Sequence, residues 1–212
     1  MQYPYTSYAF SNIGYLIVDI NEQDLKPIKD EIKIIETDYS KAEPFNNNLA
    51  GNIEKEYVLK NSFNAVDKIV APYIKLYIDH FNYLPSSFSL TKDVPIALDK
   101  PWVNFMQKYE FNPPHTHSGL FSFVIWIDVP YDIKNEMSRK ASINSASNSA
   151  GHFGFIQANA LGELRASYIP VDKTYNNKMA IFPASMMHFV NPFYTSDEYR
   201  ISVAGNYLFK VN

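Results

Sequence analysis

Apolar residues recur at helical spacing in the first half of the chain and in short alternating runs in the second half. The run 13–20 is apolar and bounded by polar residues, so it predicts a strand. Apolar stripes at about 25–35 and 62–81 predict two helices, each with one face to bury. The first half therefore contributes elements that need a partner surface.

From about residue 101 the helical period disappears, and β-branched and aromatic runs alternate with turn residues. These runs predict strands near 101–109, 119–128, 152–158, 164–169, 178–182, 187–191 and 199–209. Short strands separated by turns are typical of an antiparallel barrel or a double-sheet jelly roll. We expect a mainly β fold with flanking α-helices in one domain over 1–212, with supporting elements in 1–100 and the β core in 101–209.

The last predicted strand separates two kinds of side chain by parity. Apolar Ile201, Val203, Tyr207 and Phe209 alternate with Arg200, Ser202, Ala204 and Asn206. Successive side chains of a strand point to opposite faces, so the apolar set predicts a buried face and the other set a cavity.

The segment 131–151 interrupts the strand pattern because it is rich in Ser, Asn and Ala. Such a composition offers no face that can pack. Two interpretations are open: a solvated excursion between two strands, or a lid over the mouth of a cavity.

Composition narrows the chemistry. The chain has no cysteine, which excludes disulfides, Cys-ligated zinc, iron–sulfur clusters and thiol nucleophiles, so a metal would need His, Asp or Glu. The net charge of -3 and the pI of about 5.9 give no polybasic footprint, so we expect neither nucleic acid nor a membrane as partner. Small molecules or proteins are the expected partners, and a homodimer is left open.

The start of the chain has no secretory signal pattern, and its apolar runs are too short to cross a bilayer. We therefore expect a cytoplasmic protein. Twenty Asn, 16 Tyr and only three Arg suggest an AT-rich coding genome, bacterial or viral, so the cytoplasm is that of a bacterium or of a virus-infected host.

Three of the five histidines stand in positions that suit a metal. His115 and His117 are two residues apart, and in a strand they would project to the same side. His188 lies in a second predicted strand, and Arg200 follows it after twelve residues. If a hairpin joins these strands, His188 and Arg200 lie close together across it. An Arg aimed inward from a strand needs an anion.

These residues carry a family resemblance. Trp102-Val103-Asn104, Asn112-Pro113-Pro114-His115-Thr116-His117 and Ser122 resemble the first half of the iron(II)- and 2-oxoglutarate-dependent oxygenases, in particular the group common in marine bacteria and their phages. Gly154-Phe155, Ala180-Ile181-Phe182-Pro183, His188-Phe189-Val190 and Arg200-Ile201-Ser202 resemble the second half. His188 followed twelve residues later by Arg-x-Ser is the most specific part.

The resemblance implies a double-stranded β-helix, which is a cupin-like jelly roll with Fe(II) at its mouth. It implies that 2-oxoglutarate and O₂ bind beside the iron, that Arg200 pairs with the distal carboxylate of 2-oxoglutarate, and that Ser202 assists. It also implies that Trp102, Asn104, Ser122, Trp126 and Asn206 line the cavity.

One departure from the family pattern is His117, which stands where a carboxylate ligand is usual. The site could be a three-His iron centre formed by His115, His117 and His188. It could instead take a carboxylate from Glu110 or Asp128, or it could hold zinc for a hydrolytic reaction.

The leading hypothesis is a dioxygenase that hydroxylates an unidentified small molecule or protein side chain while 2-oxoglutarate is converted to succinate and CO₂. The alternatives are a catalytically silent jelly-roll binding or virion protein, and a three-His zinc hydrolase.

Overall fold

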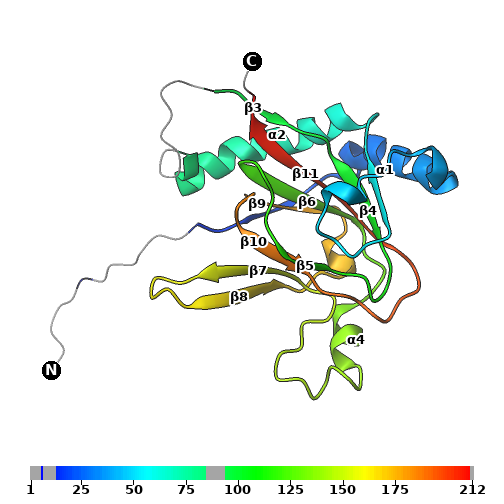
Figure 1. The fold of residues 1–212 in the computed structure, drawn as a ribbon, viewed down its shortest axis with the longest axis vertical. Coiled ribbons are helices and arrows are strands. Elements are labelled where there is room, and N and C mark those ends of the chain that lie inside the picture. The colour runs from blue at the N-terminus through cyan, green and yellow to red at the C-terminus, as the bar shows by residue number, and fades with distance from the viewer. Residues whose placement is uncertain (1–5, 7–12, 85–93, 211–212) are drawn as a thin grey trace.

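The computed structural model describes residues 6, 13–84 and 94–210, and the start of the chain, residues 1–5, lies outside them. Helices cover one side of two antiparallel sheets (Figure 1). The larger sheet contains β1 (Leu16–Asp19), β2 (Lys55–Val58), β3 (Ile96–Leu98), β4 (Trp102–Met106), β6 (Phe121–Asp128), β9 (Lys178–Pro183) and β11 (Arg200–Phe209). The smaller contains β5 (Asn112–His115), β7 (Phe153–Ala158), β8 (Leu164–Ile169) and β10 (Met187–Val190).

The larger sheet runs in the order β1-β9-β6-β11-β4-β2, with β3 paired to β11, and the smaller in the order β5-β10-β7-β8. Every pairing between these strands is antiparallel. The fold is therefore mainly β with flanking helices, as the sequence predicts.

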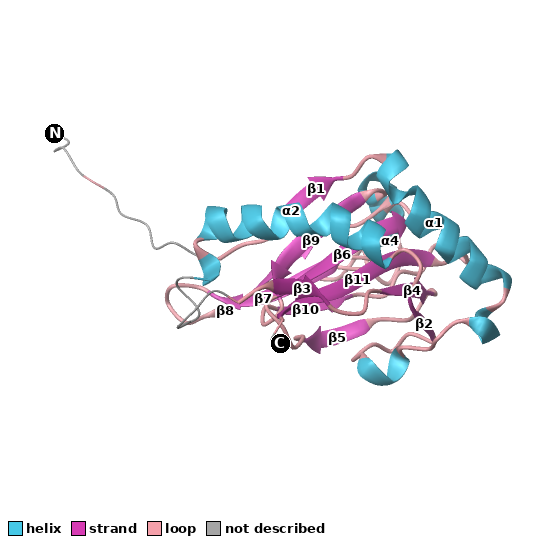
Figure 2. Cartoon of the chain, turned by 90° about the horizontal axis from the view of Figure 1, so that it is seen from above, coloured by secondary structure: helices cyan, strands magenta, loops and turns pink. Residues whose placement is uncertain are grey.

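Two helices cover the outer face of the larger sheet (Figure 2). They are α1 (Glu22–Thr37) and α2 (Phe63–Phe81), close to the predicted 25–35 and 62–81. Their buried stripes meet the odd-numbered residues of β2, β4, β6, β9 and β11 in one apolar cluster, which includes Val103, Phe105, Ile125, Ile181 and Val203. Burial of these apolar stripes against the sheet provides most of the free energy that stabilises the two helices and holds them on this face.

The even-numbered residues of the same strands point to the other side, between the sheets. One row in register across the sheet runs Glu56, Asn104, Ser202, Trp126. Some of these residues join a second apolar cluster with Phe153 and Phe155 of β7, and others leave a cavity. The alternation in β11 thus separates core from cavity as its sequence indicates.

Several elements were not predicted from the sequence. β2, β3 and β5 are strands of three or four residues, too short for a periodic signal. The pattern predicts one strand over 13–20, whereas β1 covers only Leu16–Asp19. The helices η1 (Tyr39–Lys41), η2 (Asn46–Asn48) and η3 (Lys173–Tyr175) are short 3-10 turns.

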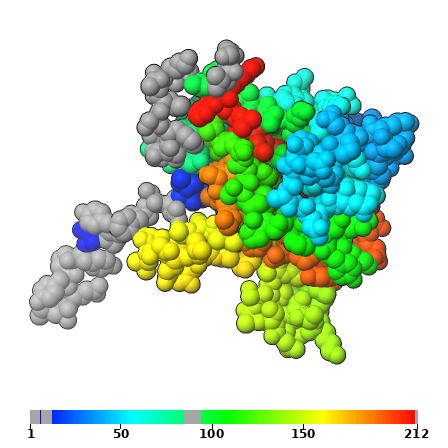
Figure 3. Space-filling view, in the orientation of Figure 1, coloured from blue at the N-terminus to red at the C-terminus, as the bar shows by residue number. Residues whose placement is uncertain are grey.

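The expectation that nothing in 131–151 packs was wrong. This segment projects from the body in Figure 3, yet it contains α4 (Ile133–Ser138), whose Glu136 is fully buried. The Glu136 carboxylate accepts hydrogen bonds from the backbone N–H groups of Tyr194 (2.9 Å) and Thr195 (2.7 Å), and from the Thr195 hydroxyl. Polar contacts therefore hold a segment that composition alone presents as unpackable.

Within the described residues, no helix combines the length and apolar character that a membrane span needs.

Candidate metal centre

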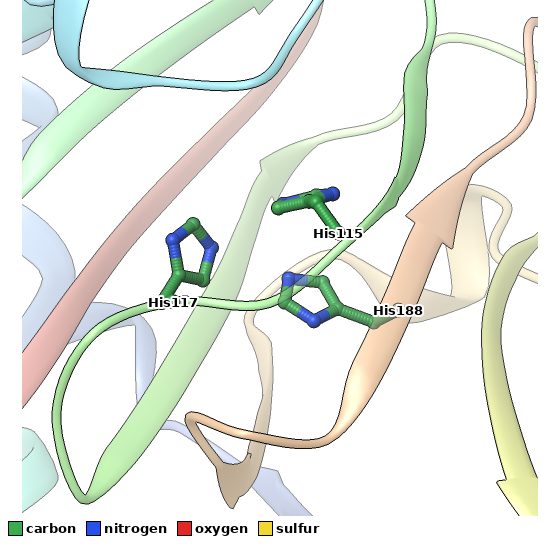
Figure 4. A group of neighbouring side chains, drawn as sticks. All are labelled: His115, His117 and His188. Carbon is green, nitrogen blue, oxygen red and sulfur yellow. The ribbon is translucent and has the colours of Figure 1, made fainter.

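Three histidines, two on strands and one in a loop, converge between the sheets (Figure 4). His115 is the last residue of β5, and His188 of β10 pairs with it in register. His117 lies in the loop beyond β5, so the expected strand stops short of it. The ring centroids of His115 and His188 are 4.3 Å apart, and the ligand nitrogens of all three lie within 4.8 Å of one another.

Hydrogen bonds to backbone carbonyls fix two of the rings. Nδ1 of His115 lies 2.6 Å from the Pro113 carbonyl oxygen, and Nδ1 of His188 lies 2.9 Å from that of Met186. A carbonyl only accepts, so each Nδ1 carries the proton and donates it. Nε2 of both rings is left with a free lone pair, which is the usual arrangement in metal-binding histidines.

Burial keeps the three rings neutral. Burial, with a smaller contribution from His115, lowers the pKa of His117 to about 4. Burial also lowers the pKa of His188 to about 3, with His115 and His117 acting in the same direction and the Met186 carbonyl opposing. The pKa of His115 is lowered by burial, against the hydrogen bond to Pro113. Three uncharged imidazoles at neutral pH form a nitrogen donor set that suits Fe(II) or Zn(II).

Neither predicted carboxylate joins this group. Among the described residues, the only set of His, Cys, Asp or Glu side chains with metal-ligand spacing is His115, His117 and His188. Glu110 instead accepts hydrogen bonds from the backbone N–H groups of Glu54 (2.9 Å) and Gln107 (2.6 Å). Asp128 lies at the exposed end of β6. In this arrangement neither carboxylate lies within the histidine group.

The histidines open into a partly enclosed cavity with about 650 Å³ of empty space when the part open to solvent is counted. Its lining includes the predicted Trp102, Asn104, Ser122, Arg200, Ser202 and Asn206 together with the three histidines. Trp126 is the exception: it is fully buried and packs against Phe153 and Tyr175 in the apolar cluster. Its ring is large enough to fill the space between the sheets, so it does not reach the cavity.

Arg200 reaches this cavity without an acidic partner. Its side chain is 2% exposed, and among the described residues no carboxylate lies within ion-pair distance of it. Nη1 donates to the Tyr131 hydroxyl at 3.2 Å and to the Gly151 carbonyl at 3.5 Å. The nearby Asp197 is paired with Lys108 instead. A buried guanidinium with only neutral partners has the capacity to bind an anion.

Hydrogen bonds among the polar side chains near Arg200 fix their orientations. Trp102 Nε1 donates to Asn104 Oδ1 at 3.1 Å, and Asn104 Nδ2 donates to Ser202 Oγ at 3.3 Å. Ser202 therefore accepts through its oxygen and keeps its own proton to donate to a ligand. Farther along the sheet, Ser122 donates to Asn206 Oδ1 at 2.7 Å.

His188 and Arg200 are not neighbours across a hairpin, contrary to the prediction. β10 belongs to the smaller sheet and β11 to the larger, so the connection between them crosses from one sheet to the other. The two side chains line the same cavity, one from each sheet. A double-sheet fold places residues close together without pairing their strands.

Sequence reasoning missed three contributors. Glu56 of β2 lines the cavity, the loop residues Leu49, Ala50, Gly51 and Ile53 cover part of it, and Tyr131 contacts Arg200. No lining residue comes from 131–151, so of the two open interpretations the lid finds no support, and the loop 49–53 borders the cavity instead. A glutamate in a four-residue strand and a short loop give no local signal of this kind.

Comparisons with known proteins agree with this geometry. A family model described as "Putative 2OG-Fe(II) oxygenase" matches residues 100–206, which is half of the chain. No curated protein matches the sequence.

Solved structures show a similar fold. A prolyl-4-hydroxylase from Pseudomonas putida superposes with a TM-score of 0.55 at 12% identity, covering 93% of each chain. The non-heme α-ketoglutarate-dependent epimerase SnoN from nogalamycin biosynthesis gives a TM-score of 0.57 at 13% identity, over 92% of this chain and 78% of that one. An oxidoreductase of the 2OG-Fe(II) oxygenase family from Burkholderia pseudomallei gives 0.53 at 13% identity, over 92% and 84%.

Proposed function

Because the chain belongs to this family of 2OG-Fe(II) oxygenases, we propose that it is a dioxygenase that hydroxylates a primary substrate while converting 2-oxoglutarate to succinate and CO₂. The reaction class is inferred from the family, and the residues assigned to the reaction are those that line the cavity. The primary substrate, a small molecule or a protein side chain, is not identified by the family.

The observation that carries the proposal is the buried Arg200 in the same cavity as the three histidines. A planar guanidinium can form two parallel hydrogen bonds to a carboxylate. 2-Oxoglutarate has a carboxylate at each end, so one end can occupy Arg200 while the 2-oxo acid end faces the histidines. Ser202 lies two residues along β11 on the same face and can donate its free proton to the Arg200-bound carboxylate.

The histidines fit the metal that this family implies. His115 and His188 present their Nε2 atoms, and His117 is uncharged and adjacent, so these three side chains would hold Fe(II). The bound iron supplies the oxidative chemistry, while the protein orients the substrate and excludes water. Three neutral ligands leave the centre one unit more positive than two histidines and a carboxylate would.

The protein's own residues set the orientation of the cosubstrate. Arg200 is held by Tyr131 and Gly151, so its guanidinium is positioned before a ligand arrives. The Trp102, Asn104 and Ser202 chain of hydrogen bonds fixes the Ser202 hydroxyl beside it. Phe153 and Phe182 line the wall next to His188 and keep this end of the cavity apolar.

Anaerobic addition of Fe(II) and 2-oxoglutarate to the metal-free protein tests the proposal. We expect a visible metal-to-ligand charge-transfer band, and on admission of air the formation of succinate measured by mass spectrometry. Absence of the band at full iron occupancy would contradict the proposal and favour a silent binding protein. A screen of candidate substrates for a gain of one oxygen atom then addresses the primary substrate.

The same three-histidine donor set favours a second candidate, a zinc hydrolase. Metal analysis of the purified protein distinguishes the two when combined with the succinate assay. A protein that retains zinc, releases no succinate with iron and binds no 2-oxoglutarate would support the hydrolase.

A further inference from the structure

Glu56 brings a second ionisable group into the cavity. It lies on β2, its side chain is 1% exposed, and it lines the same cavity as the histidines and Arg200. Glu56 pairs in register with Asn104, which in turn pairs with Ser202 on β11. Two strand spacings therefore separate Glu56 from Ser202, which is roughly 10 Å across the sheet.

The hydrogen bonding of Glu56 differs from that of the other buried glutamates. The Glu31 carboxylate accepts four hydrogen bonds, at 2.6–2.9 Å, from the residues that precede α2. Glu136 accepts three from Tyr194 and Thr195. Within the described part of the chain, Glu56 accepts a single long one, from Asn46 Nδ2 to Oε2 at 3.4 Å. Glu31 and Glu136 are saturated structural groups, whereas Glu56 retains most of its acceptor capacity.

No cation compensates Glu56. Burial, with a smaller contribution from Glu110, raises its pKa to about 8, and no basic side chain acts in the opposite direction. None of the ion pairs formed by the described residues includes it. A carboxyl group in this setting is costly to keep and has no local structural partner that explains it.

A second unused acceptor lies beside it. Asn112 Oδ1 is buried and has no hydrogen-bond partner. A Cβ at Gly51 would lie 2.2 Å from Asn112 Oδ1 and 3.4 Å from Glu56 Oε1, so the absence of a side chain at Gly51 leaves these two acceptors close together. All three residues line the cavity.

We propose that Glu56, with Asn112 beside it, binds a positively charged nitrogen group of the primary substrate, an ammonium or a guanidinium. This inference rests on the proposed function, since it assigns the substrate end of the same cavity. A cation with several N–H donors satisfies a carboxylate and an amide oxygen together, which a neutral hydroxyl or a second acid does not. Arg200 takes the anionic cosubstrate, and Glu56 selects a cationic substrate on the other side.

Matched pairs of small probes test the proposal without knowledge of the full substrate. The charged probes are n-butylammonium and methylguanidinium, and their neutral counterparts are 1-butanol and N-methylurea. Binding is measured by calorimetry, with the metal-free protein and with the protein loaded anaerobically with Fe(II) and 2-oxoglutarate. We expect the charged probes to bind the wild-type protein roughly ten- to hundredfold more tightly than the neutral ones.

Two substitutions in the cavity and one control at the surface locate the binding. Glu56→Gln keeps the size of the side chain and removes the charge, so the preference for the charged probe should disappear. Glu163→Gln removes an exposed carboxylate that pairs with Arg165, and it should leave the preference intact. Gly51→Ala, which places a methyl group between the two acceptors, should weaken binding of the charged probes as well.

Equal binding of charged and neutral probes to the wild-type protein, failure of both cations to bind, or an unchanged preference in Glu56→Gln would each overturn the proposal. The wild-type comparison needs no variant, so it stands even if a substitution fails to fold. Loss of the charge-transfer band with 2-oxoglutarate would refute the proposed function alone. Loss of the cation preference with the band intact would refute only the assignment of Glu56.

Discussion

Nη1 of Arg200 lies 3.2 Å from the hydroxyl oxygen of Tyr131, and that hydroxyl donates to the Gly151 carbonyl at 2.8 Å. Tyr131 and Gly151 are the two ends of the segment 131–151. No residue of this segment lines the cavity, but its two end residues hold the Arg200 guanidinium that does.

Arg200→Lys should raise the apparent KM for 2-oxoglutarate by roughly ten- to hundredfold, because the lysine keeps the charge but loses the paired hydrogen bonds. Iron binding should be unchanged, since Arg200 does not contact the histidines' ligand atoms. Steady-state kinetics and iron titration measure the two effects. Arg165→Lys, at an exposed ion pair, is the matched control. Normal 2-oxoglutarate binding by Arg200→Lys would remove Arg200 from the cosubstrate site.

Tyr131→Phe should raise the same KM more modestly, by roughly three- to tenfold, because the Arg200 guanidinium loses one neutral partner and becomes less well oriented. The free energy of unfolding should fall by about 1 kcal/mol through the lost bond to Gly151. Kinetics and chemical denaturation measure these quantities. Tyr168→Phe, on the exposed side of β8, should change neither. A drop in kcat at constant KM would show a role for Tyr131 other than holding Arg200.

His115→Ala and His188→Ala should abolish iron retention, because each removes a ring whose Nε2 is fixed by a backbone hydrogen bond. His117→Ala should weaken iron binding less, since its ring has no such hydrogen bond among the described residues and lies beyond the end of β5. Metal content after dialysis measures retention. His80→Ala, at an exposed position of α2, is the control. Full iron occupancy in His188→Ala would contradict the assigned centre.

Glu56→Gln should stabilise the protein progressively as the pH rises. The pKa of Glu56 is about 8 in the folded state against 4.5 ordinarily, so the folded wild-type protein holds a proton that the unfolded chain releases. Wild-type stability therefore falls between about pH 5 and pH 8, and the Gln variant avoids this loss. The gain at pH 8 should be roughly 2 to 4 kcal/mol, less than the whole shift implies because water relieves part of the penalty.

Denaturant unfolding of both proteins at pH 5 and pH 8, without metal or ligand, measures this difference. Glu163→Gln should follow the wild type at both values. A constant difference between wild type and Glu56→Gln would show that Glu56 is not the titrating group.

The sequence by itself determined the elements with a strong local period. The helical stripes of α1 and α2 and the alternation in β11 depend only on which neighbours along the chain are apolar. The candidate site residues His115, His117, His188, Arg200 and Ser202 were proposed from motif spacing and from the family resemblance, which are also properties of the sequence alone. In the structure these five residues line one cavity.

Only the tertiary structure decided from which sheet each of these residues enters the cavity. His188 and Arg200 face each other from two different sheets, and Glu56 enters the cavity from a strand that pairs with β4. Trp126, which shares its row with Ser202, fills the core instead of the cavity. Strand pairing between distant segments and the filling of space between sheets depend on the summed packing of the whole chain, which no local pattern contains.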